Sequence, residues 1–207
     1  GGGELYGFAT YSARDNESAA FYRNPSSGAS SALDDGDNVI PDGFLPLINS
    51  QIDDFSINLG FQRDFDKGLG MDVSYTAGEN TIEYQTRNSI NYSFVNFANF
   101  GQGLSDQEIR DSIPRSASAY ELSLGLQTLN VDFTQQFGDL ALAYGAEYRI
   151  DEYEIGPGEP YAYKDFDTLD GNSLFPQDAS GGVQGFPGIA PVSAVDEDRD
   201  VFSLYID

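Results

Sequence analysis

The sequence predicts an all-β protein of antiparallel, up-and-down transmembrane β-barrel strands, about six of them, with long loops on the extracellular side. The breaks between alternating segments are by turns tight and long along the 207 residues. Tight breaks lie at 65–70 and 137–139, and long polar breaks lie near 24–50, 87–117 and 154–198. An antiparallel sheet with short turns at one end and long loops at the other produces this order, which is typical of outer-membrane barrels.

The first predicted hairpin has one apolar and one polar face. Its clearest strand spans 54–62, where every second residue is apolar: Phe55, Ile57, Leu59 and Phe61. After a turn at 67–68 the alternation resumes with Met71, Val73, Tyr75 and Ala77. Because successive side chains of a strand point to opposite faces, this period of two separates the apolar and polar sets.

A second hairpin repeats the pattern through 129–134, a turn at 138–139, and 140–150. The stretch upstream, 120–126, alternates in the opposite phase. Two explanations remain open. A bulge near Thr128 would reconcile the phases. Alternatively, the stretch extends above the membrane, where neither face of the strand has to be apolar.

The remaining segments are shorter or less regular. Strands are expected at 5–13 and 201–207, a short helical turn at 105–112, and a turn at 34–38. The first four residues show no basic region followed by an apolar stretch, so no signal peptide is expected. Since 201–207 reads as the opening of a strand, we expect 1–207 to be part of a single barrel domain of a longer protein.

Alternation alone does not separate a membrane barrel from a soluble β-sandwich, because both place one face of each strand against an apolar environment. Loops longer than about 12–15 residues are uncommon in compact domains unless functional, which favours the barrel. Aromatic residues add support if they form girdles at two membrane interfaces, although strand propensity also explains them. The girdle residues would be Phe61, Phe65, Phe133 and Phe137 near the tight turns, and Tyr84, Tyr148 and Tyr153 one membrane thickness away.

Composition excludes several functions. The net charge of −24 argues against nucleic-acid binding and against basic docking on an anionic membrane, while it suits cations, cationic ligands or a salty habitat. The absence of Cys and His removes disulfides, thiol catalysis and the usual general base, so no enzyme and no cofactor are expected. Calcium-loop spacing occurs at Asp196, Asp198 and Asp200, but Val201 stands where a calcium loop needs Gly, and no metal site is assigned.

Candidate ligand contacts lie in two of the long loops. Aromatic side chains with polar groups between them suit a sugar or an aromatic chelate, and the alternative is an acidic, solvated loop whose aromatics pack locally. The candidates in the third loop are Tyr161, Tyr163, Phe166, Phe175 and Phe186. Those in the second loop are Arg110 and Arg115.

Several stretches resemble the barrel of TonB-dependent outer-membrane receptors: 4–25, 44–61, 142–163, 181–191 and 200–207. The most specific are the strand ending in GAEYR before a Gly-Glu-Pro loop, and the late QGFPG loop. The order and spacing of these stretches carry the resemblance. Receptors of this family have a signal peptide, a TonB box, an N-terminal plug and a 22-strand barrel, and this sequence shows none of the first three.

The resemblance implies active uptake of a scarce nutrient (a ferric siderophore, a cobalamin or an oligosaccharide) across the outer membrane of a Gram-negative bacterium. The implied partners are outer-membrane lipid, the TonB system acting through a plug, and a small nutrient ligand, with no nucleic acid. One alternative is a secreted or surface β-sandwich, an adhesin or carbohydrate-binding module with calcium-binding acidic loops. Another is an outer-membrane lipase or protease, which the absence of His weakens.

Overall fold

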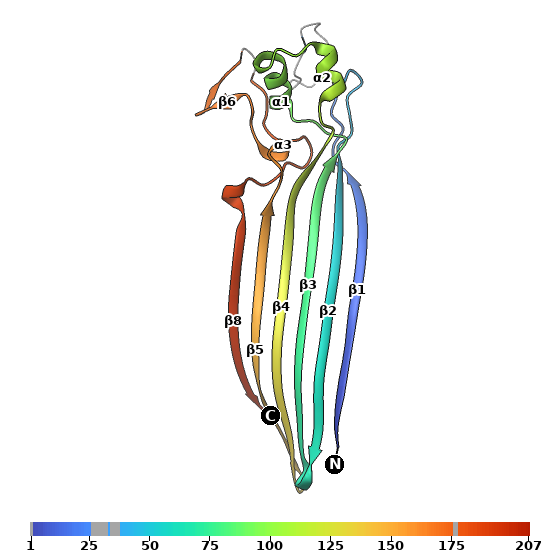
Figure 1. Ribbon diagram of the computed structural model, residues 1–207, viewed down its shortest axis with the longest axis vertical. Coiled ribbons are helices and arrows are strands. Elements are labelled where there is room, and N and C mark those ends of the chain that lie inside the picture. Colours follow the sequence, from blue (N-terminus) through green and yellow to red (C-terminus); the bar gives the residue numbers. More distant parts are fainter. Residues whose placement is uncertain (1, 26–32, 34–37, 176–177) are drawn as a thin grey trace.

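The computed structural model describes residues 2–25, 33, 38–175 and 178–207. One antiparallel sheet of six long strands dominates it (Figure 1), and every strand in the sheet pairs with its neighbours in sequence. This up-and-down order confirms the all-β, antiparallel prediction. The strands in order are β1 (Gly3–Ala19), β2 (Leu47–Phe65), β3 (Leu69–Arg87), β4 (Ser116–Phe137), β5 (Leu140–Pro157) and β8 (Val195–Ile206).

The short and long connections lie at opposite ends of the sheet, as predicted. A 3₁₀ turn, η1 (Asp66–Gly68), joins β2 to β3, and residues 138–139 join β4 to β5. Lys67 and Gly68 both have positive φ, which this tight turn requires and which glycine adopts without strain. Both chain ends also lie at this end (Figure 1). We call it the turn end, and the opposite one the cap end.

The strands are longer than their alternating segments indicated. β2 begins seven residues before the predicted 54–62, and β8 begins at Val195 rather than at 201. The ladder of backbone hydrogen bonds continues where apolar alternation stops, since strand pairing depends on the backbone and not on which side chains are apolar. The second and third loops, 88–115 and 158–194, are correspondingly shorter than predicted, whereas the first, 20–46, is shifted but has the predicted length.

The predicted bulge near Thr128 is wrong. Pairing between β3 and β4 is continuous from Tyr84 opposite Tyr120 to the turn end, and Thr128 lies directly opposite Thr76. The register shift instead lies between Tyr84 and Gln85, where Ala119 is the extra residue. In 120–126 the apolar side chains therefore lie on the opposite face of the sheet from those in 129–134.

The three long connections fold together into a cap above the strand ends (Figure 1), which we define as residues 20–25, 33, 38–46, 88–115, 158–175 and 178–194. The helical turn predicted at 105–112 is confirmed. Ser105 begins it with a capping box that includes Glu108, a strong helix start. The cap contains α1 (Tyr92–Asn96), η2 (Phe97–Gly101), α2 (Asp106–Ser112), α3 (Pro160–Tyr163), η3 (Pro191–Ser193) and the small hairpin of β6 (Thr168–Leu169) and β7 (Asn172–Ser173).

The buried apolar core of the described residues sits in the cap. Within the strands, the buried apolar side chains are Ala117 and Ala119, at the cap end of β4. The turn predicted at 34–38 lies outside the described residues except for Asn38. Among the described helices, none is long and apolar enough to cross a membrane. The main core cluster is formed by Leu33, Val39, Phe44, Ile90, Tyr92, Val95, Ala98, Ile109 and Ile113.

Candidate functional site

The register aligns the apolar positions of all six strands on one face, which we call the first face. Near the turn end these side chains form a continuous apolar band. They are half-buried to exposed: Leu59 keeps 55% of its surface accessible, Phe202 67% and Leu204 72%. One row of paired residues is apolar on every strand, and it consists of Leu5, Phe61, Val73, Val131, Ala146 and Leu204.

The band is slanted relative to the rows of paired residues. Its limit toward the cap lies at Tyr11 and Phe55 on β1 and β2, which are direct partners. On β8 the limit lies at Phe202. The row of paired residues that contains Phe202 meets β2 at Leu59, which is two first-face positions nearer the turn end than Phe55. Such a slant arises when tilted strands cross an apolar zone of constant height, such as a membrane. The strands of membrane barrels tilt by about 35–45°.

The second face, opposite the band, is polar and tied together by side-chain hydrogen bonds across the strands. Asn58 Nδ2 donates to Thr76 Oγ1 at 2.8 Å, and Asn80 Nδ2 donates to Asp54 Oδ2 at 3.1 Å. The hydroxyls of Thr10 and Ser56 lie 2.7 Å apart. The sheet therefore exposes its apolar side chains on one face and pairs its polar side chains on the other.

Two tyrosines of the outermost strands reach toward the centre of the second face. Tyr6 of β1 crosses Gly60 and donates its hydroxyl to Asp72 Oδ1 at 2.8 Å. From the other edge, Tyr205 of β8 crosses Gly145 and donates to Asp132 Oδ1 at 2.8 Å. A Cβ at either glycine would overlap the ring above it, so both positions require the absence of a side chain.

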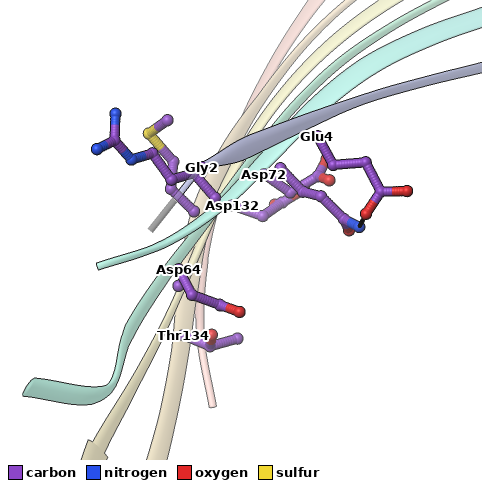
Figure 2. A pocket seen from close by; sticks show the side chains of 10 residues that line it. Gly2, Glu4, Asp64, Asp72, Asp132 and Thr134 are labelled. Atoms are coloured by element: carbon purple, nitrogen blue, oxygen red, sulfur yellow. Dashed lines mark hydrogen bonds between the residues drawn. The ribbon is translucent and has the colours of Figure 1, made fainter. Parts of the chain in front are cut away.

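Asp72 and Asp132 are direct cross-strand partners at the centre of this arrangement. They line an open hollow of about 300 Å³ near the turn end, with Glu4 and Asp64 (Figure 2). Like charges directly opposite each other destabilise a sheet, and here each of the two central carboxylates accepts a tyrosine hydroxyl. The hollow is acidic, and Arg63 is its basic residue.

Toward the cap the two faces exchange character. The first face becomes acidic, with carboxylates directly opposed in the pairs Glu83–Glu121, Glu152–Asp198 and Glu154–Asp196. The second face becomes apolar at its centre. The residues there are Ile52, Ile82, Tyr84, Tyr120, Leu122, Leu124 and Leu126.

The exchange corrects one expectation about the aromatic girdles. Phe61, Phe133 and Tyr148 share the first face, as a girdle requires, but Tyr84 and Tyr153 lie on the second face. At the positions of Tyr84 and Tyr153, the apolar side chains of β3 and β5 already lie on the second face. Tyr84 packs instead against Tyr120 and Phe186, with ring centroids 5.0 Å and 5.3 Å apart.

Of the predicted ligand contacts, Tyr161 has the most fixed position. Its hydroxyl donates to the Pro114 carbonyl at 2.8 Å and accepts from the Asn91 N–H at 3.1 Å. Burial raises the pKa of Tyr161 to about 12, against the smaller opposing effects of the Asn91 hydrogen bond and the Arg115 charge. The phenol therefore stays protonated and joins the second and third loops. Tyr163, at the end of α3, is half-buried.

The three predicted phenylalanines pack within the molecule rather than forming one open platform. Phe166 meets Phe94 edge-on at 4.9 Å, and Phe175 lies 5.9 Å from Phe100. Phe186 covers Tyr84 and Tyr120, and its carbonyl accepts from Thr86 Oγ1 at 2.6 Å. The third loop thus leans over the cap end of the second face.

The two predicted arginines belong to the second loop, and the charge of Arg115 acts on Tyr161 of the third. Arg115 donates from Nη2 to Asn88 Oδ1 at 2.6 Å, and its guanidinium lies 5.7 Å from the centre of the Phe44 ring. Arg110 is half-buried on α2. The seven predicted contacts are therefore spread over the cap, and their role in ligand binding stays a prediction.

The aspartates with calcium-loop spacing lie on a strand, not in a loop. Asp196, Asp198 and Asp200 share the first face of β8, where an extended backbone cannot wrap around an ion. Nowhere in the described part of the chain do three or more acidic side chains form a group that could hold a metal ion.

The sequence reasoning missed the Tyr–Gly–Asp arrangement. Tyr6, Gly60 and Asp72 are far apart in sequence, and only the register of three strands brings them into a line. A glycine at an otherwise polar position of a strand is the available signal, because it marks a close approach to the backbone. No protein-family model, curated protein or solved structure matches this chain.

Proposed function

We propose that this chain is a stretch of the wall of a transmembrane β-barrel, with the first face toward lipid and the second face toward an aqueous interior. The observation that carries the proposal is the exposed apolar band on six adjacent strands, opposite a polar face with its own hydrogen bonds. A lipid-exposed barrel wall has this distribution, whereas soluble proteins rarely expose large continuous apolar patches.

The height of the band supports the proposal. On β5 the apolar positions run from Leu140 to Ile150. Ten steps of about 3.4 Å give roughly 34 Å along the strand, and a tilt of about 45° reduces this to about 24 Å. Outer-membrane barrels carry an apolar band about 25 Å tall.

In this orientation the strands extend beyond the membrane at the cap end. The acidic part of the first face would be in water, which accounts for the exchange of polarity that no bulge explains. The cap would lie outside the cell, and the short turns would face the periplasm, following the usual asymmetry of these barrels.

Within the barrel class, we propose a TonB-dependent receptor of the outer membrane that takes up a small nutrient. The support is the sequence resemblance together with the large cap at one end of the sheet. Ligand capture would take place at the cap, and the candidate contacts remain Tyr161, Tyr163, Phe166, Phe175, Phe186, Arg110 and Arg115. Because the Tyr161 hydroxyl already joins two loops, its contribution would come from its ring.

The β-sandwich alternative requires a second sheet over the apolar band. In the described ranges, the only other sheet is the two-residue pairing of β6 with β7, which belongs to the cap. No observation on the described residues therefore favours the sandwich over the barrel.

Cysteine scanning of β3 in the full-length protein tests the barrel proposal. The chain contains no Cys, so single substitutions at 71–77 can carry a spin label whose collisions with oxygen in lipid and with a water-soluble nickel chelate are compared. We expect Met71, Val73, Tyr75 and Ala77 to be in lipid and Asp72, Ser74 and Thr76 in water. Equal access of the chelate to both sets, in a protein that needs no detergent, would reject the proposal.

A further inference from the structure

Asp167 is a fully buried carboxylate with one oxygen that no donor satisfies. Its side chain has no accessible surface. Oδ2 accepts from Asn96 Nδ2 at 2.7 Å and from the Ala179 N–H at 2.9 Å, whereas Oδ1 has no hydrogen-bond partner. Buried polar atoms are almost always hydrogen-bonded, so Oδ1 requires an explanation.

A second carboxyl group, that of Asp165, lies beside it. Asp165 Oδ1 accepts from the Asp167 N–H at 3.1 Å. Burial raises the pKa of Asp167, and hydrogen bonding with the Asp165 carboxyl raises it further, against the opposing effect of the bonds from Asn96 and Ala179. Both residues belong to a segment that we call the strap, residues 164–175 and 178–181, which lies across α1.

The surroundings offer little compensating positive charge. Lys164 is the basic residue of the strap, and its ammonium group lies 4.9 Å from the centre of the Phe166 ring. Asp178 adds a further negative charge and accepts from Thr168 Oγ1 at 3.5 Å. Helices α1 and η2 hold no charged side chain, and Tyr92 is their one titratable group.

We propose that Asp165 and Asp167 share one proton, and that this proton fastens the strap to α1 so that a rise in pH loosens it. The proton sits on Asp167 Oδ1 and is donated to the Asp165 carboxylate. This arrangement satisfies the unpartnered oxygen and leaves a single negative charge at the exposed member of the pair. Asp167 then joins three segments: the end of α1, the start of the strap and its return at Ala179.

Loss of the proton has a defined direction. With the folded-state pKa of Asp167 above its unfolded value, the stabilisation is complete below the unfolded pKa and is lost as the pH rises through the folded pKa. Above it, a buried carboxylate faces a second carboxylate, and burying an unpaired charge is costly. The strap should then separate from α1 while the rest of the cap core stays folded.

The inference goes beyond the proposed function, because it requires neither a membrane nor a ligand. Its test is hydrogen exchange of residues 164–181, measured by mass spectrometry on the full-length protein between pH 5 and pH 8 and corrected for intrinsic exchange rates. We expect protection to fall about tenfold for each pH unit between the unfolded and the folded pKa of Asp167, and to level off above the folded pKa. Asp167→Asn keeps an oxygen for Asn96 and Ala179 and offers an N–H to Asp165. It should therefore hold full protection at pH 8.

Four further results decide the matter. Asp165→Asn should also abolish the pH dependence, since either member of the pair is required, and it covers the case in which Asp167→Asn does not fold. Asp178→Asn, at an exposed acid of the same strap outside the pair, should leave the dependence unchanged. Protection in the unsubstituted protein that does not vary with pH would overturn the proposal, and so would protection at pH 8 that 1 mM calcium restores and a chelator removes, because a cation would then hold the pair.

Discussion

The cap and the turn end of the sheet place their apolar side chains in opposite ways. In the cap, Val95 and Ile109 have no accessible surface, α1 and α2 begin at capping residues, and rings pack against rings. In the sheet, apolar side chains of similar size stand exposed in a continuous band. The two regions belong to one chain, so composition cannot explain the difference.

The comparison shows that the two regions require different partners. The cap buries its own apolar surface, and its buried polar side chains are hydrogen-bonded within it, with the exception of Asp167 Oδ1. The second face of the sheet is also hydrogen-bonded, although Asn58 Oδ1 has no hydrogen-bond partner, but the described chain leaves the apolar band on the first face uncovered. Lipid is the partner that we propose, and substitutions in the two regions can be compared directly.

The largest expected effect is on the band. Val131→Arg places a charge in the row of paired residues that is apolar on all six strands, and in lipid this should cost about 2–4 kcal/mol. The stability of the full-length protein folded into detergent or lipid, measured by denaturant titration, checks it. Asn130→Arg on the second face is the matched control and should change little. Equal effects of about 0.5 kcal/mol or less would indicate an ordinary water-exposed surface.

The second effect concerns the polar face. Gly60→Ala drives a methyl group into the Tyr6 ring and should displace that ring from Asp72, at about 1–3 kcal/mol, the usual cost of overpacking. Gly156→Ala is the control, since its new Cβ would lie 3.6 Å from the nearest atom. The same denaturant titration measures both variants. If they behave alike, the contact between Tyr6 and Gly60 does not help to hold the sheet.

Within the cap, Tyr161→Phe removes the hydroxyl that joins the second and third loops. Leaving the Asn91 N–H and the Pro114 carbonyl without partners should cost about 1–3 kcal/mol. The measurement is the hydrogen-exchange protection of the Asn91 amide, which should fall while protection in β3 is unchanged. Protection at Asn91 equal to that of the parent protein would show that water replaces the hydroxyl.

A smaller effect is expected at α2. Ser105→Ala removes the capping hydroxyl of the helix, which typically costs about 1 kcal/mol, and exchange in 106–109 should accelerate. Hydrogen bonds from Ser105 lower the pKa of Glu108, so their contribution is present above the unfolded pKa of Glu108 and is lost as the pH falls through the folded value. Ser112→Ala, at the other end of the helix, should have less effect. An equal change in both variants would contradict a capping role.

The smallest predicted change is stabilising. Glu121→Gln removes one charge from the directly opposed Glu83–Glu121 pair, and at low ionic strength it should stabilise the sheet by about 0.2–1 kcal/mol. The gain should disappear in about 1 M salt, where charges are screened within about 3 Å. Glu17→Gln breaks the exposed pair with Arg87 and should not stabilise. Unfolding measured at both salt concentrations separates these outcomes.

The strand order and the positions of the turns were predictable because tight turns need particular residues and because alternation marks a face. The strand ends were not, since pairing continues into stretches without alternation, as at Leu47 and Val195. α1 was missed because its five residues are too few for a helical period to be recognised. The pairing of Asp167 with Asp165 depends on burial, which spacing in the sequence does not encode.

The reversal of polarity along the strands also constrains how the chain finds its register during folding. A slip of one residue would turn every side chain to the wrong face, but with uniform alternation a slip of two would go undetected. Here a two-residue slip of β3 or β5 toward the turn end would move Glu79 or Glu152 to the depth that Ala77 or Ile150 now occupies, inside the band. The boundary between the band and the acidic zone thus acts as an alignment mark, and it gives each strand a single correct depth.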